Sequence, residues 1–441
     1  MTLGIEWISL LMFLALVILL VSGLPLAWAT GAIGTITLLL LFGHSGMLMF
    51  VSRIFRTTLS FDLVAVPLFI LMASILQRCG IAEDLFQAVH IWSGKLRGGL
   101  AIGTIISCVI MAAMTGVVGA EIVTFGMVAL PAMLNRKYDK HLALGSICAG
   151  GGMATLIPPS VVFIVYAMTA GASVGDLFLA GVFPGLILAA LFIVYIVWAT
   201  MKNPKLAPPA PPEERDIPLV EKFMLLKGLI MPAGLAVAVL GSIYAGIATP
   251  SEAAGVGCLG ALATAALKRQ LTYRLMKDSI FEASRVSCII MWLVLGAQTI
   301  IGVYTLAGGD DFVRNAILAL PFGRWGTIIY MQVLLIVMGM FLEWIGILML
   351  TTPLFLPIIL DMGFSSVWFG VVFCMNMHVS YLSPPFGPSV FYIKSVVPED
   401  ISMTDCYRAV WPFTVMTLIA LVITVAFPGL SLWLPEVILG K

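Results

Sequence analysis

The chain has 441 residues, of which 61% are hydrophobic and only 10% are charged, and its formal net charge is +1. A soluble domain carries roughly 25% charged residues, so this composition excludes a water-soluble fold and indicates a membrane protein. The small net charge gives no reason to expect a nucleic-acid partner. The seven cysteines are widely spaced without a CxxC pair, which is typical of apolar packing residues rather than metal ligands or disulfides.

Uncharged apolar runs recur along the chain, at residues 10–21, 188–200 and 414–426. With its flanks, each run approaches the roughly 20 residues that cross a bilayer as a helix. The first run has no basic residue before it and continues into a second apolar run, so we expect a retained span rather than a cleaved signal.

Two interrupted apolar segments follow in the first half. The first segment, from about residue 99 to 134, is interrupted near Thr115 and Gly119, and the second, from about 142 to 169, contains the pair Pro158-Pro159. Basic clusters flank the first segment, so it starts and ends on one side of the membrane. It is therefore either two tight spans or a re-entrant hairpin, and the second segment is predicted to be a broken helix.

Residues 201–227 are rich in proline and charge, which predicts an extended polar linker between residues 1–200 and residues 228–441. The second half repeats the pattern of the first, with an interrupted segment at about 326–360 and a Pro-Pro segment at about 365–393. An offset of 226 aligns Pro131 with Pro357, Pro158-Pro159 with Pro384-Pro385, and Tyr166 with Tyr392. We therefore predict an internal duplication.

Charge predicts that the two copies are inverted. The first interrupted segment has basic flanks, whereas the second is flanked by Asp310, Asp311 and Asp361 and is expected outside the cytoplasm. The two hairpins then enter from opposite faces, and inverted repeats of this kind are typical of secondary transporters.

The Pro-Pro pairs have a chemical consequence because each removes backbone donors and interrupts its helix at membrane depth. Freed carbonyls can coordinate a cation such as sodium, and the free amides at the start of the next helix suit an anion. The hydroxyls of Thr155, Ser160, Ser383 and Ser389 add oxygen ligands. Alternatively, each pair is only a kink filled by neighbouring side chains.

Ionisable residues at membrane depth give a second signal because they are unfavourable there without a partner or a role. Glu121 and Glu343 follow the two predicted hairpin tips, where each could hold a cation, carry a proton or simply accept a hydrogen bond. His378 is more typical of a structural histidine. Glu252, in the pattern Thr-Pro-Ser-Glu, is predicted to cap a helix.

These segments resemble the large membrane subunit of the tripartite ATP-independent periplasmic (TRAP) transporters over nearly the whole chain. The matching stretches are VPLFILM (66–72), TLIPPS (155–160), GDLFLAG (175–181), ATPSEAA (248–254), MFLE (340–343), VWFGVV (367–372) and SPP (383–385).

The resemblance implies an all-α polytopic protein of the bacterial inner membrane that works as an elevator, in which a transport domain with both hairpins and both broken helices slides along a fixed scaffold. It also implies coupling to Na⁺ with no other cofactor, contact with membrane lipid, and a small carboxylate as substrate. The implied partners are a smaller four-helix membrane subunit and a periplasmic binding protein that delivers the substrate.

The resemblance also assigns the expected contact residues. Substrate and ion contacts are expected from the first tip, the first break, the second tip and the second break: Thr115, Gly116, Val117, Gly119, Glu121, Thr155, Ile157, Pro158, Pro159, Ser160, Glu343, Asn376, Ser383, Pro384, Pro385 and Gly387. The sodium ligands are expected among Thr115, Gly116, Thr155, Pro158, Glu343, Ser383 and Pro384.

One departure concerns the first tip, which in the family is often serine-rich. Here it reads TGVVGAE (115–121), so a cation there would rely on backbone carbonyls, Thr115 or Glu121. At the second tip Glu343 stands where an aspartate is common.

Two other classes compete with this interpretation. One is a related anion and cation symporter that works without a binding protein. The other is an intramembrane enzyme or channel, but the four histidines are scattered and no nucleophile–base or metal motif is present, so we do not expect an enzyme.

Overall fold

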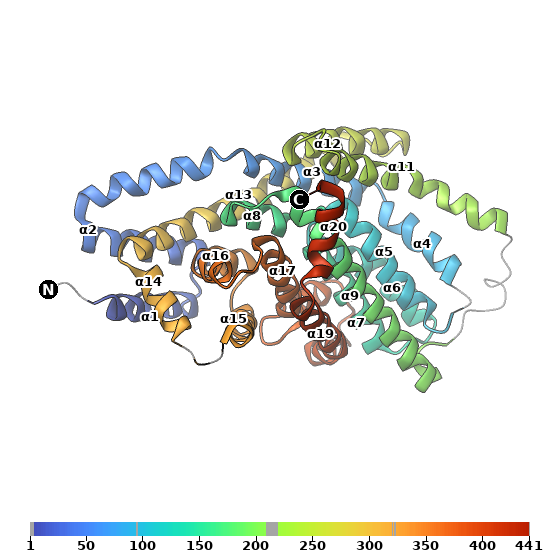
Figure 1. Cartoon of the computed structure of the whole chain (residues 1–441). Coiled ribbons are helices and arrows are strands. Elements are labelled where there is room, and N and C mark those ends of the chain that lie inside the picture. Colours follow the sequence, from blue (N-terminus) through green and yellow to red (C-terminus); the bar gives the residue numbers. More distant parts are fainter. Residues whose placement is uncertain (1–3, 94–95, 209–218, 320, 322, 441) are drawn as a thin grey trace.

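The computed structural model of the chain describes residues 4–93, 96–208, 219–319, 321 and 323–440, and within these ranges the ordered elements are all helices (Figure 1). The first half contains α1 (Ile5–Val21), α2 (Leu26–Thr58), α3 (Ala65–Arg78), α4 (Ile81–Ser93), α5 (Gly99–Thr115), α6 (Ala120–Asn135), α7 (Lys140–Gly151), α8 (Val161–Ala170) and α9 (Val174–Lys202). Short 3₁₀ turns η1 (Phe61–Val64), η2 (Gly152–Thr155) and η3 (Pro204–Leu206) lie between them.

The second half contains α11 (Leu219–Tyr244), α12 (Pro250–Leu267), α13 (Tyr273–Leu306), α14 (Gly309–Leu318), α15 (Gly323–Gly339), α16 (Trp344–Asp361), α17 (Ser366–Leu382), α18 (Pro388–Lys394), α19 (Met403–Ala426) and α20 (Gly429–Leu439). Two helix ends repeat at the offset seen in the sequence: the last residue of α16 lies 226 positions after the last residue of α6, and the first residue of α17 lies 226 positions after the first residue of α7.

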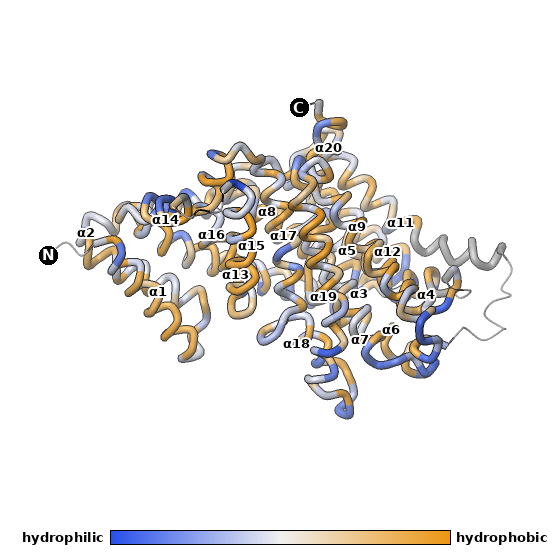
Figure 2. The backbone as a smooth tube through the Cα atoms, turned by 60° about the horizontal axis from the view of Figure 1, so that its bottom comes forward, coloured by the Kyte–Doolittle hydropathy of each residue, from blue (hydrophilic) through white to orange (hydrophobic). Residues whose placement is uncertain are grey.

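Five helices of the described ranges are long and apolar enough to cross a membrane, and α3 with α4, bent by 64°, could form a sixth span. The five are found within α2, α9, α13, α16 and α19. Apolar residues run along most helices, and polar residues gather in connections such as those next to α4 and α6 and in the short helix α14 (Figure 2). The prediction of an all-α, multi-pass membrane protein is therefore confirmed.

Helices overlap both ends of the predicted linker at 201–227. Residues 209–218 lie outside the described ranges, residues 201–202 end α9, and residues 219–227 already belong to α11. The apolar residues Leu219, Val220 and Phe223 recur at helical spacing, so the helix begins before the charged residues end.

One group of helices is organised around α2 and α13, which pack against each other along the left arm in Figure 1. The rings of Trp28 and Trp292 stack at 4.9 Å between these two helices. Helix α3 packs on both α12 and α13, and α11 packs on α12 and α4. Helix α12 starts with a capping box between Thr249 and Glu252, which confirms that Glu252 caps this helix.

A second group contains the two helix pairs that turn back on themselves, α5–α6 and α15–α16, and the two interrupted helices α7–η2–α8 and α17–α18. Helix α7 packs on α5, α6 and α19, and α17 packs on α8, α9, α15 and α19. Gly145 permits close contact between α7 and α19, because a Cβ there would lie 2.6 Å from the ring of Phe413. The two interrupted helices therefore belong to one packed unit.

Candidate functional site

A cavity of about 610 Å³ lies where the two groups of helices meet. One wall is formed by residues 116–120 between α5 and α6, the first turns of α6, α8 and α16, and two tyrosines of the second interrupted helix, Tyr381 and Tyr392. The opposite wall comes from α3, α4 and α13 and includes Arg78, Glu83 and Glu282. The volume suits a small organic molecule.

Three helices begin at this cavity, and none has a side-chain cap. The residues at the N-cap positions of α6, α8 and α16 are Gly119, Ser160 and Glu343, and none of these side chains hydrogen-bonds to the first turn of its helix. The Ser160 hydroxyl instead donates to the Thr155 carbonyl at 2.8 Å. The Val161 amide of α8 donates to the Gly116 carbonyl, but the other first-turn amides have no side-chain cap and carry partial positive charge, so the three helix ends together favour a bound anion.

The tip between α5 and α6 rests directly on the first Pro-Pro break. The amide of Val161 donates to the Gly116 carbonyl at 3.3 Å. Gly116 has a φ of +63°, and a Cβ on it would lie 2.8 Å from the carbonyl carbon of Pro159. Only glycine fits both the backbone conformation and the space. The tip and the break therefore form one continuous edge of the cavity.

Behind this edge lie Thr115 and Glu121, both fully buried and outside the cavity lining. The Thr115 hydroxyl contacts Glu121 Oε1 and also lies 3.0 Å from the Met111 carbonyl, although it has one proton to donate. The other carboxyl oxygen, Glu121 Oε2, has no hydrogen-bond partner among the described residues. A buried carboxyl group with an open oxygen can take up a proton or a cation.

The residues of the first break support the cavity rather than line it. Thr155, Ile157, Pro158, Pro159 and Ser160 are all buried. The next residues in the chain, Val161 and Val162, are the ones that line the cavity.

The second break lies elsewhere. Pro384 and Pro385 are exposed, and among the described residues that line the cavity none comes from 383–387. Ser383 donates to the Val379 carbonyl at 2.8 Å, and the Tyr407 hydroxyl donates to the Pro385 carbonyl at 2.6 Å. Gly387, at φ +35°, is the N-cap residue of α18. The second broken helix thus reaches the cavity through its tyrosines, not its prolines.

Asn376 is also away from the cavity. It is fully buried on α17, and its side-chain amide donates to the backbone oxygen and the side-chain oxygen of Gln332 at 2.9 and 2.8 Å. These bonds join α17 to α15 inside the same unit as the breaks.

Of the predicted site residues, the structure brings Gly116, Val117, Gly119 and Glu343 to one cavity. The aromatic residue Tyr392 covers Gly119, where a Cβ would lie 2.8 Å from the tyrosine ring. Sequence reasoning missed the opposite wall, where Arg78 is the last residue of the apolar helix α3 and Glu282 lies among the charged residues in the first part of α13. The signal that the sequence offered is Arg78, a charge at the end of an apolar helix.

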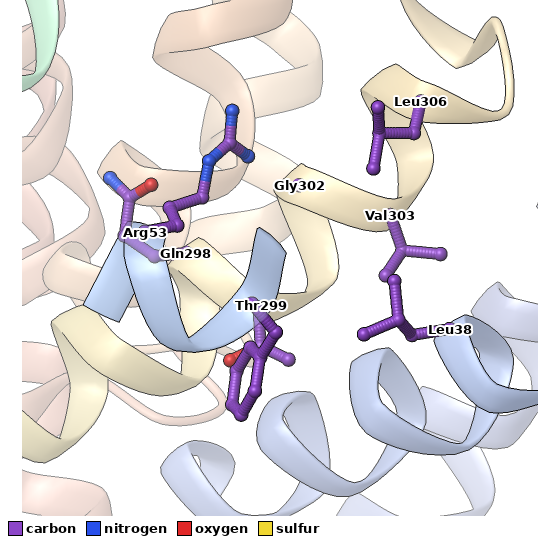
Figure 3. Close-up of a pocket in the computed structure, with 8 residues that line it drawn as sticks. Leu38, Arg53, Gln298, Thr299, Gly302, Val303 and Leu306 are labelled. Atoms are coloured by element: carbon purple, nitrogen blue, oxygen red, sulfur yellow. The ribbon is translucent and has the colours of Figure 1, made fainter. Parts of the chain in front are cut away.

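A second, smaller pocket of about 100 Å³ lies between α2 and α13 (Figure 3). It is lined mainly by apolar side chains such as Leu38 and Val303, and Arg53 lies beside Gly302. It contains none of the predicted site residues.

The interrupted helices, the uncapped helix ends and the cavity between two packed groups define a multi-pass membrane transport protein. Two solved transporters share this fold at 12% identity and a TM-score of 0.60 each. One is Neisseria gonorrhoeae MtrF, described as an antimetabolite efflux pump, with 88% of this chain and 85% of that chain covered. The other is the Alcanivorax borkumensis YdaH transporter, with coverage of 92% and 98%.

The family is shown by sequence. The model of the tripartite ATP-independent periplasmic transporter DctM component matches residues 13–430. The C4-dicarboxylate TRAP transporter large permease protein DctM of Pseudomonas aeruginosa is 30% identical, with 92% of this chain and 93% of that protein covered. The ectoine TRAP transporter large permease protein TeaC of Halomonas elongata is 28% identical, with 95% and 96% covered. The sialic acid TRAP transporter large permease protein SiaM of Vibrio cholerae is 26% identical, with 96% and 97% covered.

The chain belongs to the DctM family of TRAP transporter large permeases. The resemblance found in the sequence is therefore confirmed. Its relatives are transporter permeases and not enzymes, as the sequence predicted.

Proposed function

We propose that this chain is the permease subunit that carries a small carboxylate across the bacterial inner membrane through the 610 Å³ cavity. The observation that supports this most directly is that the three uncapped helix N-termini of α6, α8 and α16 begin at the cavity. Each end offers amides and a partial charge of roughly +0.5 to an anion. The relatives named above for C4-dicarboxylate, ectoine and sialic acid transport agree with an organic acid as substrate.

Sodium is the proposed coupling ion, and the buried pair of Thr115 and Glu121 is its best-supported position. The open oxygen Glu121 Oε2 and the Thr115 hydroxyl are hard oxygen ligands directly behind the tip that borders the anion cavity. An ion there would stiffen the tip and so favour binding of the anion. The carbonyls of the breaks, at the buried Pro158 and the exposed Pro384, are further candidates from the sequence.

An elevator motion is the proposed mechanism. The unit that contains both interrupted helices packs around α7, α17 and α19, whereas α2, α3, α12 and α13 form a group of their own. The cavity lies at the boundary between them, where a sliding unit would carry its substrate. The recurrence of helix bounds at an offset of 226 supports the proposed repeat.

The proposed partners are the four-helix membrane subunit and the periplasmic binding protein implied by the family. The discriminating experiment reconstitutes the membrane subunits in proteoliposomes and measures uptake of radiolabelled acid before and after addition of the binding protein. Uptake that is equally fast without the binding protein would instead support the symporter that works alone.

Sodium coupling is tested in the same vesicles by replacing Na⁺ with choline at constant pH. We expect uptake to fall to background. A Glu121→Gln variant should shift the Na⁺ concentration for half-maximal uptake, while Glu436→Gln, an exposed change on α20, should not. Uptake that continues undiminished in choline would exclude sodium as the coupling ion.

A further inference from the structure

The charges of the cavity walls are unequal. Among the described residues that line it, three side chains are carboxylates, Glu83, Glu282 and Glu343, and one is a cation, Arg78. The Arg78 guanidinium is already paired: it lies 2.7 Å from Glu282 and 3.9 Å from Asp278. The Ser74 hydroxyl fixes this arrangement, because it donates to Glu282 at 2.8 Å and accepts from Arg78 at 3.3 Å.

The unpaired charges of the cavity are therefore negative. Within the described part of the chain, neither Glu83 nor Glu343 has an ion-pair partner. Glu343 occupies the N-cap position of α16, but its carboxylate makes no capping hydrogen bond. If a substrate with two carboxylates bound one of them at the helix ends, the second would find no free cationic side chain in the cavity.

Aromatic side chains surround the acidic part of the cavity. Trp344 follows Glu343 directly, and Tyr381 and Tyr392 both lie close to Glu343 and line the same cavity. Aromatic faces attract organic cations, and a nearby carboxylate adds to this attraction. The combination is chemically suited to a substituted ammonium or amidinium group rather than to a second carboxylate.

Resting on the function proposed above, we propose that the substrate of this permease is a zwitterion. Its carboxylate binds at the N-termini of α6, α8 and α16, and its positively charged nitrogen lies between Glu343 and the ring of Trp344. The paired Arg78 and Glu282 close the opposite wall as a neutral surface. Such a substrate complements both the helix ends and the free acid, whereas a dicarboxylate complements only the helix ends.

The test begins with identification of the substrate in cells. Bacteria that express the complete transporter are grown in yeast-extract medium supplemented with equal amounts of succinate, glutarate, glycine betaine and 5-aminovalerate. The compounds that they remove are compared, by mass spectrometry, with those removed by cells that lack only this chain. We expect the chain-dependent compound to contain both a carboxylate and a positively charged nitrogen.

A chain-dependent compound that is an acid without a positive nitrogen overturns the zwitterion proposal and leaves the transport function intact. If removal of every compound is independent of this chain, the transport function itself is wrong, and the zwitterion proposal falls with it. The two failures are therefore distinguishable.

The second stage locates the positive group with variants, using the compound identified in the first. Glu343→Gln should raise the KM for it about tenfold, in the range of one lost charge pair, and leave its Na⁺ dependence unchanged. Trp344→Leu should raise the KM as well, and Trp344→Phe should restore it because the aromatic face is retained. The exposed Glu436→Gln is the matched control.

Melting temperatures in detergent show whether each variant is folded. Should Glu343→Gln change the Na⁺ concentration dependence and leave the KM unaltered, Glu343 is a sodium ligand and the proposed position of the nitrogen is wrong. Equal effects of Trp344→Leu and Trp344→Phe would likewise exclude the aromatic contact.

Discussion

Addition of one methyl group at the first hairpin tip should disable transport, and the chain provides a matched control. Gly116 and Gly171 have almost the same left-handed backbone, with φ of +63° and +64°. A Cβ on Gly171, which ends α8, would meet nothing within 4 Å. A Cβ on Gly116 would lie 2.8 Å from the Pro159 carbonyl carbon and still closer to its oxygen, whereas ordinary contacts begin at 3.4 Å.

The magnitudes of the two substitutions follow from these contacts. Alanine in a left-handed conformation costs about 1–2 kcal/mol, which applies to Gly171→Ala and Gly116→Ala alike. The clash at Gly116 adds an overpacking penalty of about 1–3 kcal/mol, because the Pro159 neighbour is backbone and cannot rotate away. Gly116→Ala should therefore be destabilising by about 2–5 kcal/mol unless the tip withdraws from the break.

The assay combines melting temperature in detergent with the initial rate of uptake in proteoliposomes. We expect Gly171→Ala to lower the melting temperature slightly and to preserve uptake. Gly116→Ala should lower the melting temperature further, or abolish uptake if the tip moves and the bond from Val161 to residue 116 is lost. Equal melting temperatures and equal uptake for both variants would refute the argument that the tip rests on the break.

Two further predictions concern contacts outside the cavity. Tyr407→Phe removes the hydroxyl that donates to the Pro385 carbonyl at 2.6 Å. The variant should lower the free energy of unfolding by about 1 kcal/mol and slow uptake, because the second break is held less firmly. Unchanged uptake would show that this break needs no support from α19. The backbone amide of Thr249 donates to Glu252 and lowers the pKa of that carboxyl. The ionised Glu252 therefore stabilises α12 fully above the pKa that this residue has in the unfolded chain, and the stabilisation is lost as pH falls through the lower pKa of the folded protein. Thermal melts between pH 3 and 7 should show this loss in the wild type and not in Glu252→Gln.

The fold was largely predictable because membrane helices are dictated by local sequence. Uncharged runs long enough to span a bilayer required helices, and the prolines at 158–159 and 384–385 required interruptions, which lie after η2 and after α17. The start of α11 at Leu219 was not predicted, because Leu219, Val220 and Phe223 lie among the charged residues of the predicted linker.

The candidate site was predictable only on one wall. The tip residues and Glu343 stand at local breaks in the sequence, so they can be chosen as candidate site residues without coordinates. The opposite wall depends on contacts between α3 and α13, and Arg78 and Glu282 are 204 residues apart. Such pairing is a property of tertiary packing. For the same reason the sequence could not show which residues of the second Pro-Pro segment line the cavity, and these are Tyr381 and Tyr392.

In the proposed site, backbone groups bind the carboxylate and side chains contact the rest of the substrate, so mutations can change its selectivity. The proposed anion-binding groups are backbone amides, which only a substitution by proline removes, so carboxylate binding should persist through most mutations of the lining. The groups that can be altered by mutation are the acids, the aromatic rings and the Arg78–Glu282 pair. Glu282→Gln would leave Arg78 with its weaker partner Asp278 at 3.9 Å and a largely free guanidinium. The side chains that face the cavity would then determine which acid is bound, whereas the backbone amides would bind the carboxylate that all these acids share.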